Sequence, residues 1–110
     1  MSAPAQSRGE QGPERAPSRD GAVVRVFCIC NKKGLHARAS AKFVQTVERY
    51  DADVRVTRGG ETVGGTSIMG LMMLAAAPGT KITVEATGKE AAEAIAALDA
   101  LIASRFGEVD

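Results

Sequence analysis

Aromatic residues are scarce in this chain of 110 residues, which contains no Trp, one Tyr and three Phe. Proteins that bind single-stranded nucleic acid stack bases on aromatic side chains, and binding to nucleic-acid backbones depends on clustered positive charge. The formal net charge here is only +1. Both features disfavour a nucleic-acid-binding function.

Long apolar runs are also absent from the sequence. No stretch approaches the roughly 18 to 20 apolar residues that a membrane span requires, and the N-terminus has no apolar run like that of a secretory signal. We therefore expect a cytoplasmic protein that does not insert into a membrane. A chain of this length can bury one modest core, so one domain with one site is expected.

Only two cysteines and one histidine are present: Cys28, Cys30 and His36. These three side chains do not complete a usual four-ligand set, so we expect no metal site, and we expect no cofactor. A C-x-C pair in a strand places both thiols on one sheet face, where small packing residues in a reducing compartment are the favoured interpretation. A small metal or thiol protein that uses the pair stays open as an alternative.

Pro, Gly, Ser, Gln, Arg and Glu are frequent in residues 1–21, which hold no aliphatic residue beyond Met1 and the alanines. Such a segment buries too little apolar surface to offset the entropy lost on ordering. We therefore predict a disordered tail over residues 1–21 and one folded domain over residues 22–107.

Seven segments of this domain alternate between strand-like and helix-like patterns. They are a strand at 23–30, a helix from about 36 to 49, strands at 53–57 and 61–64, a helix at 68–74, a strand at 81–86, and a helix after Thr87. Gly59-Gly60 suits a tight hairpin turn, and Thr87 with Glu90 matches a capping box. The order βαββαβα predicts an α+β two-layer open-faced sandwich, with a four-stranded, mainly antiparallel sheet and three helices on one face.

His36 lies at or just before the first turn of the first predicted helix. The first N–H groups of a helix lack internal partners and carry part of its macrodipole, so they favour an anion by about 0.3 to 1 kcal/mol. The same field disfavours a positively charged ring and leaves a neutral, nucleophilic imidazole. A phosphoryl group on His36 fits this position, although a helix cap or an ordinary surface residue is the competing interpretation.

The residues around His36 suit the same chemistry. Arg38 can present a fork of N–H donors to phosphoryl oxygens, and Gly34 permits a tight turn that leaves the ring accessible. Every charged residue from 21 to 47 is basic, which suits both an anion and an acidic docking partner. The chain lacks a P-loop, a Mg²⁺-binding carboxylate cluster and a second base, so we predict a phosphoryl carrier and not a self-sufficient enzyme.

The segment Gly34-Leu35-His36-Ala37-Arg38, followed about thirty residues later by Ser67-Ile68-Met69-Gly70, resembles the HPr family. These proteins are the histidine-containing phosphocarriers of the bacterial phosphoenolpyruvate-dependent phosphotransferase system. The resemblance runs from about residue 23 to 106 and includes the predicted order of elements. It implies that His36 accepts phosphate on Nδ1 from phosphorylated enzyme I and delivers it to an enzyme IIA.

Further roles follow from matching positions in the family. The resemblance implies that Arg38 is the active-site arginine, and we expect Gly34 and Ala37 to support the phosphate. Ser67 matches the serine that HPr kinase/phosphorylase modifies where that enzyme exists. A phosphate on Ser67 would add about −1.5 to −2 charge and repel an acidic partner. A plain helix N-cap is the alternative for Ser67.

Ile68, Met69 and Met72 form the apolar side of the short predicted helix. The residues alone favour a core position for this side. In the family, however, the positions of Ile68 and Met69 contribute to partner contact, and methionine suits surfaces that accept several partners. We therefore include these three side chains as candidate partner-binding residues, and we expect a monomer.

Ala39 departs from the family pattern, which usually has proline after the arginine. This difference leaves open whether the chain serves sugar uptake or a nitrogen-linked regulatory phosphorelay. A second hypothesis from another functional class is a regulatory binding protein. Phosphorylation of Ser67 would then switch its association with a partner, without obligatory phosphoryl transfer through His36.

Overall fold

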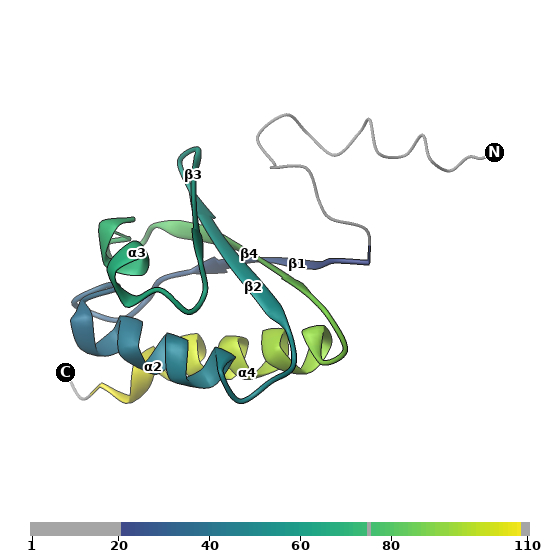
Figure 1. The fold of residues 1–110 in the computed structure, drawn as a ribbon. Coiled ribbons are helices and arrows are strands. Elements are labelled where there is room, and N and C mark those ends of the chain that lie inside the picture. Colours follow the sequence, from purple (N-terminus) through teal and green to yellow (C-terminus); the bar gives the residue numbers. More distant parts are fainter. Residues whose placement is uncertain (1–20, 75, 109–110) are drawn as a thin grey trace.

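The computed structural model describes residues 21–74 and 76–108 of the chain. The elements follow the predicted order βαββαβα, with a short 3-10 turn after the last helix (Figure 1). All of the predicted disordered tail except Gly21 lies outside the described residues.

The four strands form one sheet in the order β1-β4-β2-β3, and each neighbouring pair is antiparallel. The strands are β1 (Val23–Cys28), β2 (Asp53–Arg58), β3 (Glu61–Gly64) and β4 (Lys81–Thr87). Gly59 and Gly60 have φ angles of +59° and +88°, as the two central residues of a tight hairpin turn require. The predicted hairpin between β2 and β3 is therefore confirmed.

The helices are α2 (Ala37–Val47), α3 (Ile68–Met73) and α4 (Ala91–Ala103). Figure 1 shows α2 and α4 side by side along the sheet, with α3 near the start of α2. This arrangement confirms the predicted α+β open-faced sandwich with three helices. None of the helices in the described part of the chain combines the length and the hydrophobicity needed to cross a bilayer.

The core lies between the sheet and the apolar stripes of the helices. The apolar residues at helical spacing in and just after α2 and in α4 are buried apart from Tyr50 and Leu101, which are partly buried; the buried members are Ala39, Phe43, Val47, Ala91, Ala94, Ile95, Leu98 and Ile102. An amphipathic helix packs with its apolar side against the core. This packing holds α2 in a defined position on the sheet and therefore determines where its N-terminus lies.

The predicted capping box at the start of α4 is wrong. Strand β4 runs on through Thr87, and Glu90 is the N-cap residue without a side-chain capping bond. Glu90 Oε1 instead accepts a hydrogen bond from the backbone N–H of Asp51 at 2.7 Å. The carboxylate therefore holds the loop before β2 and does not cap the start of α4.

The packing interpretation of the two cysteines is also wrong. Cys28 and Cys30 are exposed, whereas Phe27 and Ile29 are buried, because alternate residues of an extended segment face opposite ways. The Cys30 thiol donates to the backbone carbonyl of Ile102, with Sγ 3.3 Å from the oxygen. Among the residues that the structure describes, no group of three or more His, Cys, Asp and Glu side chains could hold a metal ion.

Candidate functional site

His36 is the N-cap residue of α2, as its predicted position at the helix start required. Gly34 has a φ of +67°, and a Cβ at this residue would lie 2.4 Å from the carbonyl oxygen of Ala76. The backbone N–H of the buried Leu35 donates to the same oxygen at 3.0 Å. Only glycine permits this turn and this close approach, and together these contacts fix the loop that carries His36.

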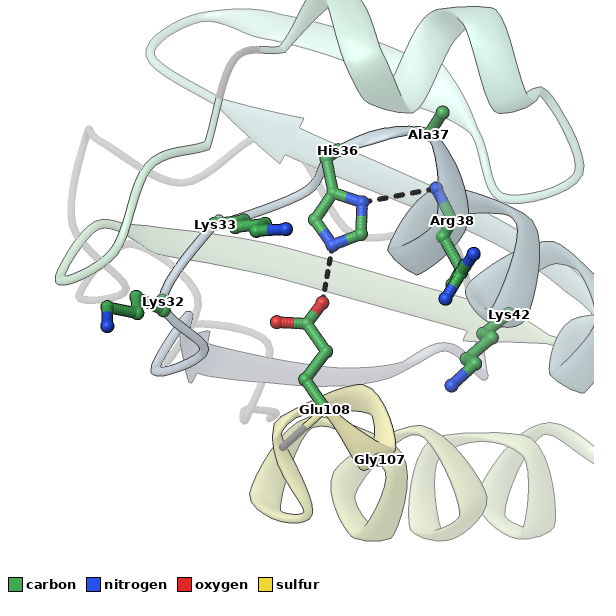
Figure 2. A pocket seen from close by; sticks show the side chains of 8 residues that line it. All are labelled: Lys32, Lys33, His36, Ala37, Arg38, Lys42, Gly107 and Glu108. Atoms are coloured by element: carbon green, nitrogen blue, oxygen red, sulfur yellow. Dashed lines mark hydrogen bonds and ion pairs between the residues drawn. The ribbon is translucent and has the colours of Figure 1, made fainter. Parts of the chain in front are cut away.

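The two ring nitrogens of His36 have different partners (Figure 2). Nδ1 accepts a hydrogen bond from the backbone N–H of Arg38 at 3.2 Å, and Nε2 bonds to Oε2 of Glu108. An ionised carboxylate only accepts hydrogen bonds, so the ring proton belongs on Nε2 and the lone pair on Nδ1. Nδ1 therefore faces the N-terminal end of α2 with its lone pair, on a side chain that keeps 28% of its surface exposed.

Glu108 belongs to the candidate site but was not predicted from the sequence. It lies 72 positions from His36, and the hydrogen bond from the His36 ring is the main cause that lowers the pKa of its carboxyl. Burial acts against that shift, while the amide of Asn31 and the charge of Lys33 add to it. One available signal was Gly107, because a glycine just past a helix often lets the chain turn back.

A depression of about 750 Å³ surrounds this pair. It is lined by Lys32, Lys33, His36, Ala37, Arg38, Lys42, Gly107 and Glu108. Figure 2 shows the cationic side chains on both sides of His36 and Glu108. Glu108 is the single acid among these lining residues, so the predicted basic neighbourhood is confirmed and the depression suits an anion such as a phosphoryl group.

The sequence-predicted residues of α3 are positioned differently. Ser67 is the N-cap of α3, and its Oγ accepts a hydrogen bond from the backbone N–H of Gly70 at 2.9 Å, which confirms the predicted cap. Ile68, Met69 and Met72 are 40%, 68% and 40% exposed, so the interpretation of these side chains as core is wrong.

The reason is that the short helix buries only one side. Leu71 and Leu74 fill the core at this end of the molecule. Met73, which was not among the predicted partner-binding residues, is 72% exposed and extends the apolar surface.

Comparisons with known proteins agree with this geometry. The family described as "PTS HPr component phosphorylation site" matches residues 23–104. Phosphocarrier protein HPr of Neisseria meningitidis is 56% identical over 80 residues, which cover 73% of this chain and 90% of that protein.

Two solved structures extend the comparison. HPr-C-His from Thermoanaerobacter tengcongensis superposes with a TM-score of 0.76 at 40% identity, over 80% of this chain and 99% of that one. Phosphocarrier protein HPr of Bacillus anthracis gives a TM-score of 0.71 at 41% identity, over 74% and 96% of the two chains. The chain therefore belongs to the HPr family and is a phosphocarrier of the phosphotransferase system, which takes phosphoryl groups from enzyme I to enzyme IIA.

Proposed function

We propose that His36 is the residue that carries the phosphoryl group, on Nδ1, and that Arg38 supports it. The orientation of the ring carries this proposal. Nδ1 faces the first turn of α2 through the N–H of Arg38, while Glu108 occupies Nε2. An incoming phosphoryl group would therefore meet N–H groups that have no partner within the helix, and the positive end of the macrodipole.

The transfer is a displacement at phosphorus. The lone pair of Nδ1 forms the new N–P bond, and the bond between phosphorus and enzyme I breaks, with its electron pair leaving on the donor. The N–H of Arg38 is then released from Nδ1 and can donate to a phosphoryl oxygen, as can the N–H of Ala37 in the same turn. Gly34 contributes by holding the loop, and the Arg38 guanidinium offsets the charge of the transferred group.

Labelling from phosphoenolpyruvate tests this assignment. With enzyme I present, the chain should acquire acid-labile, base-stable phosphate, and His36→Ala should acquire none. His36→Asn is the matched variant, because asparagine is a good N-cap and should keep α2 intact while removing the nucleophile. Label on either variant at the wild-type level would contradict the proposal, provided that thermal unfolding shows both variants folded.

Ser67 is the proposed regulatory site, with a kinase of the HPr kinase/phosphorylase type as its partner. The side chain is exposed beside exposed Ile68 and Met69, so a phosphate would add negative charge next to an apolar surface. If regulation through Ser67 is independent of phosphoryl transfer, Ser67-dependent partner binding should be complete in His36→Asn.

The exposed side chains of Ile68, Met69 and Met72, which we call the α3 patch, are the proposed docking surface for enzyme I and enzyme IIA. Their exposure and the neighbouring basic depression support this role. A surface that combines apolar and cationic groups suits acidic partners. We further propose that the chain acts as a monomer in the cytoplasm.

A further inference from the structure

We propose that Glu108 is a positioning residue for phosphoryl transfer. Its carboxylate keeps the proton of His36 on Nε2 and stabilises the positive charge that the ring acquires when Nδ1 takes a phosphoryl group. This inference rests on the proposed role of His36 as the acceptor. It concerns a residue at the far end of the chain, outside the motif around His36.

The ring of His36 is held at both nitrogens, by the N–H of Arg38 at Nδ1 and by Glu108 at Nε2 (Figure 2). Only 16% of the Glu108 side chain is exposed. A hydrogen bond with an ionised partner is stronger than a neutral one, and shielding from water reduces its screening. Glu108 therefore both sets the ring orientation and decides which nitrogen is free to react.

Asn31 in turn holds Glu108 in place. This residue is fully buried, and its Nδ2 donates to Gly34 O at 2.8 Å and to the two carboxylate oxygens of Glu108 at 3.3 and 3.2 Å. Because all these partners are acceptors, they fix which end of the amide faces the site. The cost is that Asn31 Oδ1 is buried without a hydrogen-bond partner in the described part of the chain. Such a cost is typical of a side chain retained for a functional arrangement.

The backbone before Glu108 turns the chain back toward His36. Arg105, Phe106 and Gly107 follow α4 with φ angles of +58°, +57° and +72°. Left-handed geometry is unfavourable for the two non-glycine residues and persists only where other contacts impose it. Here Phe106 is buried in the core, and Lys42 Nζ donates to its carbonyl at 2.6 Å. The turn directs Glu108 across the depression to Nε2.

The charge of the His36 ring changes during transfer, and Glu108 faces the ring throughout. Before transfer the ring is neutral with its proton on Nε2. When Nδ1 bonds to phosphorus, the ring becomes cationic and the same proton stays on Nε2, facing the carboxylate. When the phosphoryl group moves on, the N–P electron pair returns to Nδ1 and the ring is neutral again, so no proton has to enter or leave.

Glu108 therefore interacts more strongly with the phosphorylated ring than with the free ring, as the aspartate of a catalytic triad does with imidazolium. The other charged groups facing the depression are Lys32, Lys33, Arg38 and Lys42, whose charge suits the phosphoryl oxygens and not the ring. Removing the Glu108 charge should shift the equilibrium with enzyme I toward the unphosphorylated carrier.

The test compares Glu108→Gln with Glu48→Gln. Glu48 is an exposed acid at the C-cap of α2, about 18 Å from His36 at 1.5 Å of rise per residue, so this control removes the same charge far from the ring. We expect Glu108→Gln to lower the equilibrium constant for phosphorylation by enzyme I by about fivefold, and the control to leave it unchanged. The pH profile of phosphohistidine hydrolysis should shift to lower pH in Glu108→Gln alone.

A second variant, Glu108→Ala, also removes the acceptor for Nε2–H. The ¹⁵N NMR signals of the ring should show the Nε2–H tautomer in the wild type and a mixture of both tautomers in Glu108→Ala. One outcome is that the wild type is labelled on His36 while Glu108→Gln has the same equilibrium constant for phosphorylation and the same pH profile of hydrolysis as Glu48→Gln. In that case this inference fails and the proposed function stands. If the wild type takes no label on His36, both fail.

Discussion

Each nitrogen of the His36 ring has one partner, and the partners differ in charge and in origin. The N–H at Nδ1 comes from the helix that follows the ring, whereas the carboxylate at Nε2 comes from the end of the chain. A carrier must both accept and release its cargo, so its nucleophile has to be good without holding the phosphoryl group too tightly. With His36 as the proposed acceptor, the N-terminus of α2 would stabilise the phosphoryl oxygens and Glu108 would stabilise the ring, so the two demands would fall on different parts of the chain.

The contact with His36 should also make folding stability depend on pH. The hydrogen bond from His36 is the largest effect that holds the pKa of the Glu108 carboxyl below its ordinary value of 4.5, and burial opposes it. A carboxyl whose pKa is lower in the folded than in the unfolded chain stabilises the fold above the unfolded value. That contribution disappears as the pH falls through the lower, folded value.

Denaturant unfolding of the wild type and of Glu108→Gln measures this contribution. The wild type should be the more stable protein at neutral pH, and the difference should shrink once the pH drops below 4.5. A difference that is constant across this range would show that the two variants differ for a reason other than the ionised carboxylate.

The sequence predicted His36 and its surroundings because the residues that build this half of the site are contiguous. Gly34 turns the loop, Leu35 anchors it and Arg38 completes the first helical turn, all within five positions. Asn31 and Glu108 escaped prediction because their contact joins positions 77 residues apart. It depends on where α4 ends and on a left-handed turn at two residues, Arg105 and Phe106, whose types do not signal such geometry.

At the scale of elements, α3 shows how tertiary contacts support a segment that would not form alone. Six residues are too few for a stable isolated helix. Ser67 caps the first turn, and the guanidinium of Arg58 donates to the carbonyl of Leu74 at 2.9 Å at the other end. Leu71 and Leu74 are buried between these ends. The helix is therefore fixed in place while its apolar α3 patch stays exposed.

Gly70 places α3 against β3, and this leads to an unusual mutational prediction. Replacing a helical glycine by alanine commonly stabilises a protein by about 0.5 to 1 kcal/mol. At Gly70, however, the new Cβ would lie 2.9 Å from Cβ of Val63 and 3.0 Å from Oγ of Ser67. We expect Gly70→Ala to destabilise the fold by about 1 to 3 kcal/mol, because neither backbone can move without disturbing the sheet or the cap.

Thermal unfolding measures this effect, with Gly64→Ala as the matched control. Gly64 lies in β3, and a Cβ there would meet no atom within 4 Å. The control should therefore unfold at or slightly above the wild-type temperature, while Gly70→Ala unfolds below it. Stabilisation by Gly70→Ala would mean that α3 and β3 pack less closely than described.

Local patterns predicted the elements better than they predicted the neighbours of those elements. The order of helices and strands and the glycine turn were correct because each element depends on a few adjacent residues. The capping box failed because Glu90 bonds to Asp51, which is remote in sequence. The core interpretation of Ile68, Met69 and Met72 failed for a related reason. A pattern shows which side of a helix is apolar, but not whether another element covers that side.

At the scale of the whole molecule, the formal net charge of +1 does not show that basic side chains are gathered at one place on the surface. The basic depression lies at the start of α2, and Figure 1 shows α3 close to the same end of that helix. Cationic side chains and the apolar α3 patch therefore lie near each other. Charge would guide an acidic partner to this end of the molecule, and burial of methionine would retain it there.

Met69→Asp tests whether the α3 patch is the docking surface. Because the side chain is 68% exposed, the change should leave the unfolding temperature nearly unaffected. It places a negative charge where an acidic partner would bind and removes apolar contact area. With the carrier as the substrate of enzyme I, KM should therefore rise by about tenfold. The maximal rate should change little, because His36 and its supporting residues are intact.

Ala92→Asp is the control, since it adds the same charge at an exposed position of α4. Its KM should stay near the wild-type value, which separates loss of the patch from a change in overall charge. The rise in KM for Met69→Asp should also grow smaller at high salt to the extent that repulsion causes it, while the part due to lost apolar contact should persist. If Met69→Asp and Ala92→Asp give the same KM, enzyme I docks elsewhere, and the exposure of the α3 patch needs another explanation.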